Sequence, residues 1–208
     1  TLMQSGGKMN TIRWWSMVRG FWPPSGISNT VLDASTIIAG KARDKAVWKT
    51  TKRMIAALDP AFTSGGDRCM FALAWIGEFT DGIYGIEIEM MEEIQIDAGT
   101  TGVPPNYQIA EHVIRRCAEK KVPPECFAMD ATSATGLADI ISQRWSNSIK
   151  RIQFGGNATK RIVGNGDNRE SKDVYGNKVS ELWFSMEKIV TAQRLRGVDD
   201  ETAQELCV

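Results

Sequence analysis

Apolar and polar positions divide the chain from residue 53 onward into strands and helices. Strands are predicted first, at 53–59, at about 68–77 and at 83–91. In the last of these, apolar residues alternate with Glu87 and Glu89, which favours a solvated strand face for the two glutamates. Asp81-Gly82 is typical of a tight hairpin turn. These segments predict an antiparallel meander.

The second half of the chain alternates helix with strand. The first predicted elements are a helix capped by Asn106, a strand at 125–130, a helix at about 137–145 and a strand at about 149–154. A polar loop or hairpin follows at 155–177. The chain then continues with an amphipathic helix at 179–190 that Gly197 ends, and with a last helix capped by Asp199 or Asp200. A meander followed by strands that helices separate predicts a mixed five-stranded α/β sheet with helices on its faces.

Residues 1–50 have a different character. Three of the seven Trp fall in the first 22 residues, and the Pro-Pro pair of 21–26 breaks regular structure. We predict that 1–50 is the tail of a preceding domain with a linker, and that 51–208 is the folded domain.

Bulk composition narrows the class of protein. The 208 residues suffice for one substantial core. The formal net charge of zero means that no global field recruits nucleic acid, so such binding needs a local patch. A single His argues against a Ser-His-Asp triad or a multi-His zinc site. No apolar run approaches the length of a membrane span, so no membrane partner is predicted.

Two acidic residues end predicted strands. Asp59 ends the first strand and is followed by a turn that carries Gly65-Gly66-Asp67. Asp130 ends the strand at 125–130 and precedes a small-residue loop. Carboxylates fixed at strand ends suit a Mg²⁺ or Mn²⁺ site for phosphoryl chemistry. Asp67 is a further candidate metal neighbour, although a role in pinning its turn is slightly favoured.

The predicted order β-β-β-α-β-α-β-α is that of the ribonuclease-H-like fold. In this arrangement the strands that end in Asp59 and Asp130 are neighbours, so the two carboxylates face each other and could bridge one or two ions. Such ions would activate a water and neutralise charge on a scissile phosphate.

Basic residues gather around the polar segment at 155–177. They are Lys150, Arg151, Lys160, Arg161, Arg169 and Lys172. They are candidate phosphate contacts, and a solvated loop is an equally good interpretation. Asp139 is expected to be a surface charge on a helix.

Several motifs together resemble the nuclease domain of the phage terminase large subunit. They are Asp-Pro-Ala then Gly-Gly-Asp at 59–67, Met-Asp-Ala-Thr with a later Gly at 129–136, Asn-Lys-Val-Ser-Glu-Leu-Trp at 177–183, and Trp-Ser-Met-Val-Arg-Gly at 15–20 before a Pro-bearing turn. The resemblance covers nearly the whole chain.

This resemblance implies a domain that cuts concatemeric double-stranded DNA during viral genome packaging in the host cytoplasm. It implies that Asp59 and Asp130 match the first and second catalytic acids. The partners implied are an ATPase domain, a portal and a small terminase subunit.

The chain departs from that family in two places. The family's third acid lies in a Ser-Pro-Asp-like segment on a later helix, and Val208 comes before any such segment. We therefore expect a segment of a longer protein that cuts weakly by itself. The Gly-Lys pairs at 7–8 and 40–41 do not fit a P-loop, so no ATPase activity is predicted.

Two other functions fit parts of the pattern. A nucleotide-binding domain of the actin or sugar-kinase type shares the strand order, but its phosphate loop places Gly directly after the Asp, whereas Pro60-Ala61-Phe62 stands here. A non-catalytic docking module of the packaging motor is the other alternative, because the third acid is absent.

Overall fold

The computed structural model describes residues 32, 37, 40–62, 68–97, 99, 102–132, 134–164 and 166–206. Most of the predicted tail at 1–50 lies outside these residues, as does Asp67. The remaining predicted site residues all fall within them.

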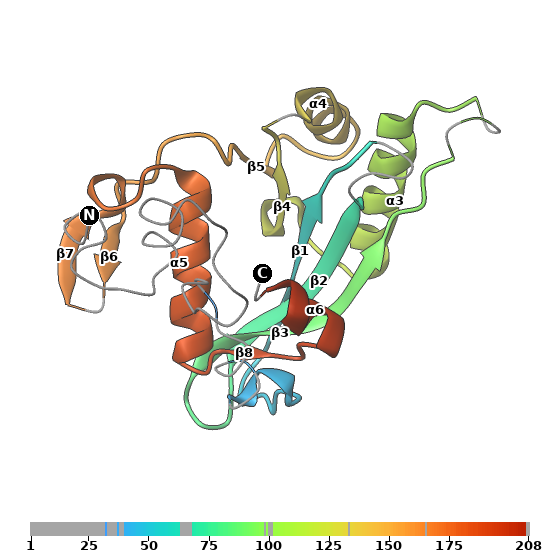
Figure 1. Ribbon diagram of the computed structural model, residues 1–208. Helices are drawn as coiled ribbons and strands as arrows, with labels where there is room; N and C mark the ends of the chain where they lie inside the picture. The colour runs from blue at the N-terminus through green and yellow to red at the C-terminus, as the bar shows by residue number, and fades with distance from the viewer. Residues whose placement is uncertain are drawn as a thin grey trace, which may run out of the picture.

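Within the described residues the main sheet has six strands in the order β5-β4-β1-β2-β3-β8 (Figure 1). Their bounds are β1 Arg53–Asp59, β2 Met70–Glu78, β3 Tyr84–Glu93, β4 Phe127–Asp130, β5 Lys150–Ile152 and β8 Leu195–Arg196. The first three form an antiparallel meander, and β4, β5 and β8 each pair parallel with a neighbour. This confirms the predicted ribonuclease-H-like mixed sheet.

Helices and a hairpin complete the described part of the fold. The α-helices are α3 Pro105–Glu119, α4 Thr135–Arg144, α5 Lys178–Thr191 and α6 Asp200–Glu205, and the short 3-10 helices are η2 Lys41–Arg43, η3 Pro124–Cys126 and η4 Ser171–Asp173. The predicted polar segment contains a separate two-stranded hairpin, β6 Ile162–Gly164 and β7 Asp167–Glu170. Figure 1 shows α5 and this hairpin standing to one side of the main sheet.

The main core lies between the sheet and the two helices α3 and α4. Alternate residues of β1 point into it, because side chains of a strand alternate between faces. Its members include Met54, Ala56, Leu58, Phe71, Leu73, Phe127, Met129, Ile109, Val113, Leu137 and Ile141. The helical spacing of the α3 and α4 residues explains why one stripe of each helix is buried.

The sixth strand was not predicted. Gly197 does not end α5, which stops at Thr191. Gln193 instead reverses the chain with a φ of 52°, and the next residues pair with β3. Gly197 then adopts a φ of 73°, and a Cβ on it would lie 2.4 Å from the Ile88 carbonyl oxygen. A two-residue strand is too short to show an alternating pattern.

Three local predictions can be compared with the structure. The prediction of Asn106 as a cap is wrong, because α3 begins at Pro105, whose fixed φ suits the first helical position. The prediction of a solvated Glu87 is also wrong, since Glu87 is buried and accepts hydrogen bonds from the Ala46 N–H (3.0 Å) and Trp48 Nε1 (3.2 Å). Asp199 is confirmed as a cap, because it accepts a bond of 2.7 Å from the Thr202 N–H.

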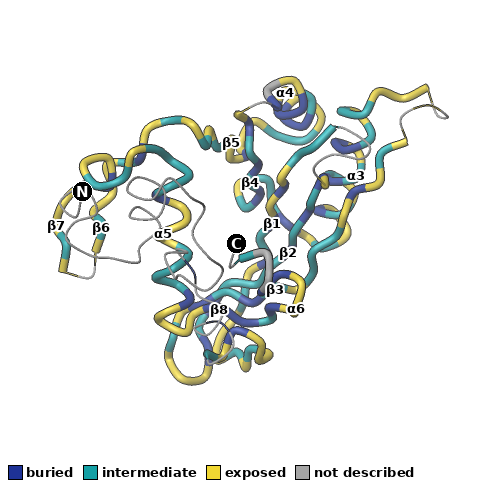
Figure 2. The backbone as a smooth tube through the Cα atoms, in the orientation of Figure 1, coloured by how far each residue is buried: buried dark blue, intermediate teal, exposed yellow. Residues whose placement is uncertain are grey.

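A second cluster of buried residues fixes only the last turns of α5. Met186, Ile189 and Val190 pack there with residues of β8 and the segment after it. The first turns differ, since Leu182, Trp183 and Phe184 are each about two-fifths exposed (Figure 2). No helix within the described part of the chain is both long and apolar enough for a membrane span.

Candidate active site

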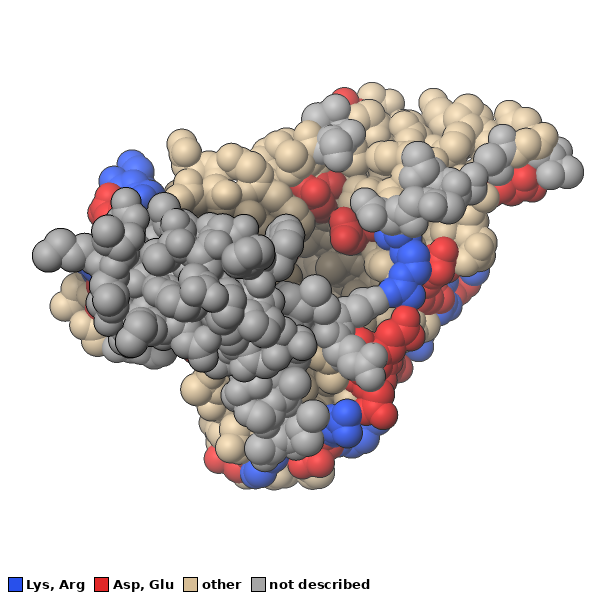
Figure 3. Space-filling model, in the orientation of Figure 1, with Lys and Arg blue, Asp and Glu red and all other residues tan. Residues whose placement is uncertain are grey.

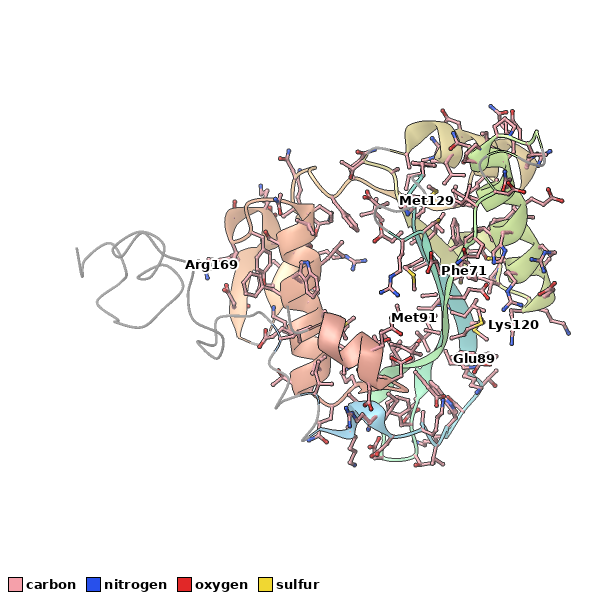
Figure 4. The ribbon with its side chains drawn as sticks, turned by 45° about the vertical axis from the view of Figure 1, so that its right-hand side comes forward. Phe71, Glu89, Met91, Lys120, Met129 and Arg169 are labelled. Atoms are coloured by element: carbon pink, nitrogen blue, oxygen red, sulfur yellow. The ribbon has the colours of Figure 1, made fainter. Side chains whose placement is uncertain are left out.

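Asp59 and Asp130 end neighbouring parallel strands. The register pairs Leu58 of β1 with Met129 of β4, so the next position on each strand is an aspartate. Adjacent strands lie about 4.8 Å apart, so the two backbones run side by side here. Leu58 and Met129 both point into the core, and Figure 4 shows Met129 at this end of β4. Asp59 and Asp130 therefore share the opposite face of the sheet.

The side chains at this end of the sheet are accessible. Asp59 is exposed and Asp130 is half-buried. Figure 3 shows a hollow in this face of the molecule, with acidic side chains at its edge near the ends of the central strands. The sheet order thus brings together the two acids that the sequence singled out, although about seventy residues separate them.

Thr132 fixes the orientation of Asp130. Its backbone N–H and its hydroxyl both donate to Asp130 Oδ1, at 2.9 Å and 2.6 Å. Oδ2 receives no hydrogen bond from any described residue, so one oxygen of the carboxylate is held and the other is open. The Thr132 hydroxyl oxygen also accepts from the Phe154 N–H at 2.8 Å, which ties this turn to the chain after β5.

Sequence reasoning missed Thr132. An Asp whose side chain bonds the backbone N–H two residues later is a common turn, so the Asp-Ala-Thr order was an available signal. The link to Phe154 was not available, because it depends on the pairing of β4 with β5.

Thr132→Val is expected to weaken Mn²⁺ binding about tenfold, as loss of a group that orients a metal ligand does. Valine keeps the branched shape but removes the hydroxyl, so Asp130 loses one bond and the Phe154 N–H loses its acceptor. Isothermal titration calorimetry measures the change. Thr132→Ser keeps the hydroxyl and should retain most of the affinity. Equal losses in both variants would contradict a role through the hydroxyl.

The six predicted DNA-binding cations fall into two groups. Arg151 donates to Asp139 Oδ1 (2.6 Å) and Ser142 Oγ (2.7 Å), so it fastens β5 to α4. Arg169 and Lys172 also pair with acidic neighbours, at 2.7 Å and 2.8 Å. Figure 4 places Arg169 on the hairpin, far from Met129 at the acid end of the sheet.

The remaining cations are Lys150, Lys160 and Arg161. They are exposed, and they make no ion pair with any residue that the structure describes. Lys150 lines a cavity of about 300 Å³ on the face of the sheet that carries the two acids, together with Arg53 and Ala128. These cations are therefore the better candidates for phosphate contacts.

The donor set suits a hard divalent cation. Mg²⁺ is commonly bound by one or two carboxylates, with waters and substrate phosphates as its other ligands. Asp59 and Asp130 supply two carboxylates, and the open Oδ2 of Asp130 is a suitable ligand atom. Among the described residues no group of three or more His, Cys, Asp or Glu is placed to hold a metal ion, and the third candidate, Asp67, lies outside them.

Fold and site together define a ribonuclease-H-like α/β domain with paired carboxylates at the ends of its central strands. No family model matches the sequence, and no curated protein matches it. Among solved structures, the chain is similar to Thermus thermophilus RuvC, with 12% identity and a TM-score of 0.37 over 74% of this chain and 89% of that one. It is also similar to the human cytomegalovirus terminase nuclease domain, with 12% identity and a TM-score of 0.36 over 74% of this chain and 73% of that one. The fold assignment rests on the strand order of the main sheet.

Proposed function

We propose that this chain is a metal-dependent endonuclease domain that cuts concatemeric double-stranded DNA during viral genome packaging. The observation that carries the proposal is the parallel pairing of β1 with β4, which sets Asp59 beside Asp130 on one face. Two carboxylates at such a point suit an ion that handles phosphates. The packaging role comes from the sequence motifs that resemble the terminase large subunit.

Asp59 and Asp130 would hold Mg²⁺ or Mn²⁺, with Asp67 as a further candidate ligand. Such an ion supplies Lewis-acid chemistry, since it lowers the pKa of water and neutralises charge on a phosphate. Thr132 keeps one oxygen of Asp130 occupied and so would leave the other available to hold the ion. Lys150, Lys160 and Arg161 would contact phosphates of the DNA backbone.

The partners proposed are double-stranded DNA, an ATPase domain of the same protein, a portal and a small terminase subunit, and the place of action is the host cytoplasm. These rest on the sequence resemblance.

Plasmid nicking tests the nuclease proposal. Supercoiled plasmid with Mn²⁺ is expected to convert slowly to the nicked form, and EDTA should stop the conversion. Asp59→Asn should reduce the rate about 100-fold or more, because it removes a charged ligand of an ion that stabilises the transition state. Nicking that persists in EDTA, or that Asp59→Asn leaves unchanged, would count against the proposal.

A further inference from the structure

The first turns of α5 carry three consecutive exposed apolar side chains. Leu182, Trp183 and Phe184 are 41%, 40% and 41% exposed. Farther along the helix, Met186, Ile189 and Val190 pack against the second core cluster. Contiguous exposed apolar side chains mark a binding surface more often than scattered ones do. We call the neighbouring aromatic residues Tyr175 and Phe184 the aromatic ledge.

The rings of Tyr175 and Phe184 are already stacked. Their centroids are 5.3 Å apart and their planes differ by 18°. Phe184 nevertheless remains 41% exposed, so part of its ring is open to a further planar group. Exposed aromatic rings of this kind form platforms on which unpaired bases stack, with little dependence on base identity.

Two exposed cations lie in a segment that packs along α5. The segment before β6 is fixed to the first turn of α5, because the Thr159 N–H donates to Glu181 Oε2 at 2.8 Å. At the other end of the helix, Lys188 Nζ donates to the Val163 carbonyl oxygen at 2.8 Å. Lys160 and Arg161 fall between these two contacts, so they run along α5 with their charges exposed.

Hydrogen bonds connect the start of α5 to the turn that orients Asp130. The Thr132 hydroxyl, which orients Asp130, accepts a bond from the Phe154 N–H. The carbonyl oxygen of Phe154 in turn accepts from the Val179 N–H at 3.1 Å, in the first turn of α5. The start of α5 is therefore held close to the end of the sheet that carries the acids.

We propose that the aromatic ledge, with Lys160 and Arg161, binds an unpaired nucleic-acid strand beside the acid pair. The bases stack on the rings and the phosphates contact the cations. A nucleic acid is favoured over an apolar protein segment because Lys160 and Arg161, in the segment that packs along α5, carry exposed positive charge. This inference rests on the proposed function for its biological setting. It adds that the nuclease prefers DNA that is locally unpaired.

Fluorescence anisotropy in EDTA tests this binding without cleavage. The probes are a labelled 20-nucleotide oligothymidine and a labelled duplex of the same length. The parent protein is expected to bind the single strand more tightly than the duplex. Phe184→Leu should weaken single-strand binding about tenfold, because one stacking contact is lost. Arg161→Gln should make the slope of the logarithm of the binding constant against the logarithm of the salt concentration less steep by about one unit.

Tyr84→Leu is the matched control, since Tyr84 is an exposed aromatic residue, 53% accessible, at the start of β3. It should leave both affinities unchanged, and circular dichroism melts establish that the variants fold. Equal affinity of the parent for both probes, or an unchanged affinity in Phe184→Leu, would overturn the proposal. So would self-association of the parent that Phe184→Leu abolishes in sedimentation, since the ledge would then serve a second copy of this chain.

The test is independent of the nuclease proposal. Asp59→Asn should retain full single-strand binding in EDTA, because Asp59 does not belong to the ledge. Loss of nicking with retained binding would support both proposals. In a different outcome, the parent nicks plasmid while Phe184→Leu binds the single strand as tightly as the parent does. That outcome would reject the ledge proposal and leave the nuclease proposal standing.

Discussion

Asp130→Asn is expected to weaken Mn²⁺ binding about 100-fold or more. This loss exceeds the effect expected for Thr132→Val, which removes only a group that orients the metal ligand. The substitution keeps the shape of the side chain, and its carbonyl oxygen can still accept the two bonds from Thr132. It removes the negative charge, which is the property a hard divalent cation requires of its ligand. Titration calorimetry gives the affinity, and Mn²⁺-dependent thermal stabilisation is a second readout.

Asp139→Asn is the matched control. Asp139 is an exposed aspartate on α4, nine residues later in the chain, and its carboxylate pairs with Arg151. This variant should bind Mn²⁺ as the parent does. If Mn²⁺ raised the melting temperature equally in the parent and in Asp130→Asn, the assignment of the metal site to the strand ends would be wrong.

The pairing of the two acids could be predicted because strand order is a strong signal. The meander and β4 show clear apolar patterns, and a sequence of this type has few ways to form a mixed sheet. Once β4 lies beside β1, Asp59 and Asp130 meet by register alone. No side-chain detail was needed for that step.

Features that depend on distant contacts could not be predicted. Glu87 alternates with core residues like its neighbour Glu89, and only the segment that carries Ala46 and Trp48 makes it a buried acceptor. The ion pair of Arg151 with Asp139 likewise depends on distant parts of the chain, because it requires β5 to lie next to α4. Local pattern cannot distinguish a cation held in such a pair from one that is open to a phosphate.

A buried charged cluster holds the start of α5 against the segment before β6. The side chains of Glu181 and Lys178 are only 9% and 18% exposed, and their charged atoms lie 2.7 Å apart. Glu181 also accepts bonds from the N–H and the hydroxyl of Thr159. Burial by itself would raise the pKa of Glu181, but the bonds from Lys178 and Thr159 outweigh it and lower the pKa to about 2. The ionised carboxylate therefore stabilises the folded state.

Glu181→Gln is expected to lower the free energy of unfolding at pH 7 by about 3 kcal/mol, because it leaves the Lys178 charge without its partner. The folded pKa lies below the ordinary value of 4.5, so this contribution is fully present above pH 4.5 and is lost as the pH falls toward 2. Urea unfolding of parent and variant at pH 7, 4 and 3 should show the difference between them shrinking with acid. Glu187→Gln, on the same helix, is the control, since Glu187 makes no hydrogen bond or ion pair with the described residues and should change stability little at any pH. A difference between parent and Glu181→Gln that stayed constant from pH 7 to pH 3 would show that packing, rather than the charge of Glu181, fastens α5 to the segment before β6.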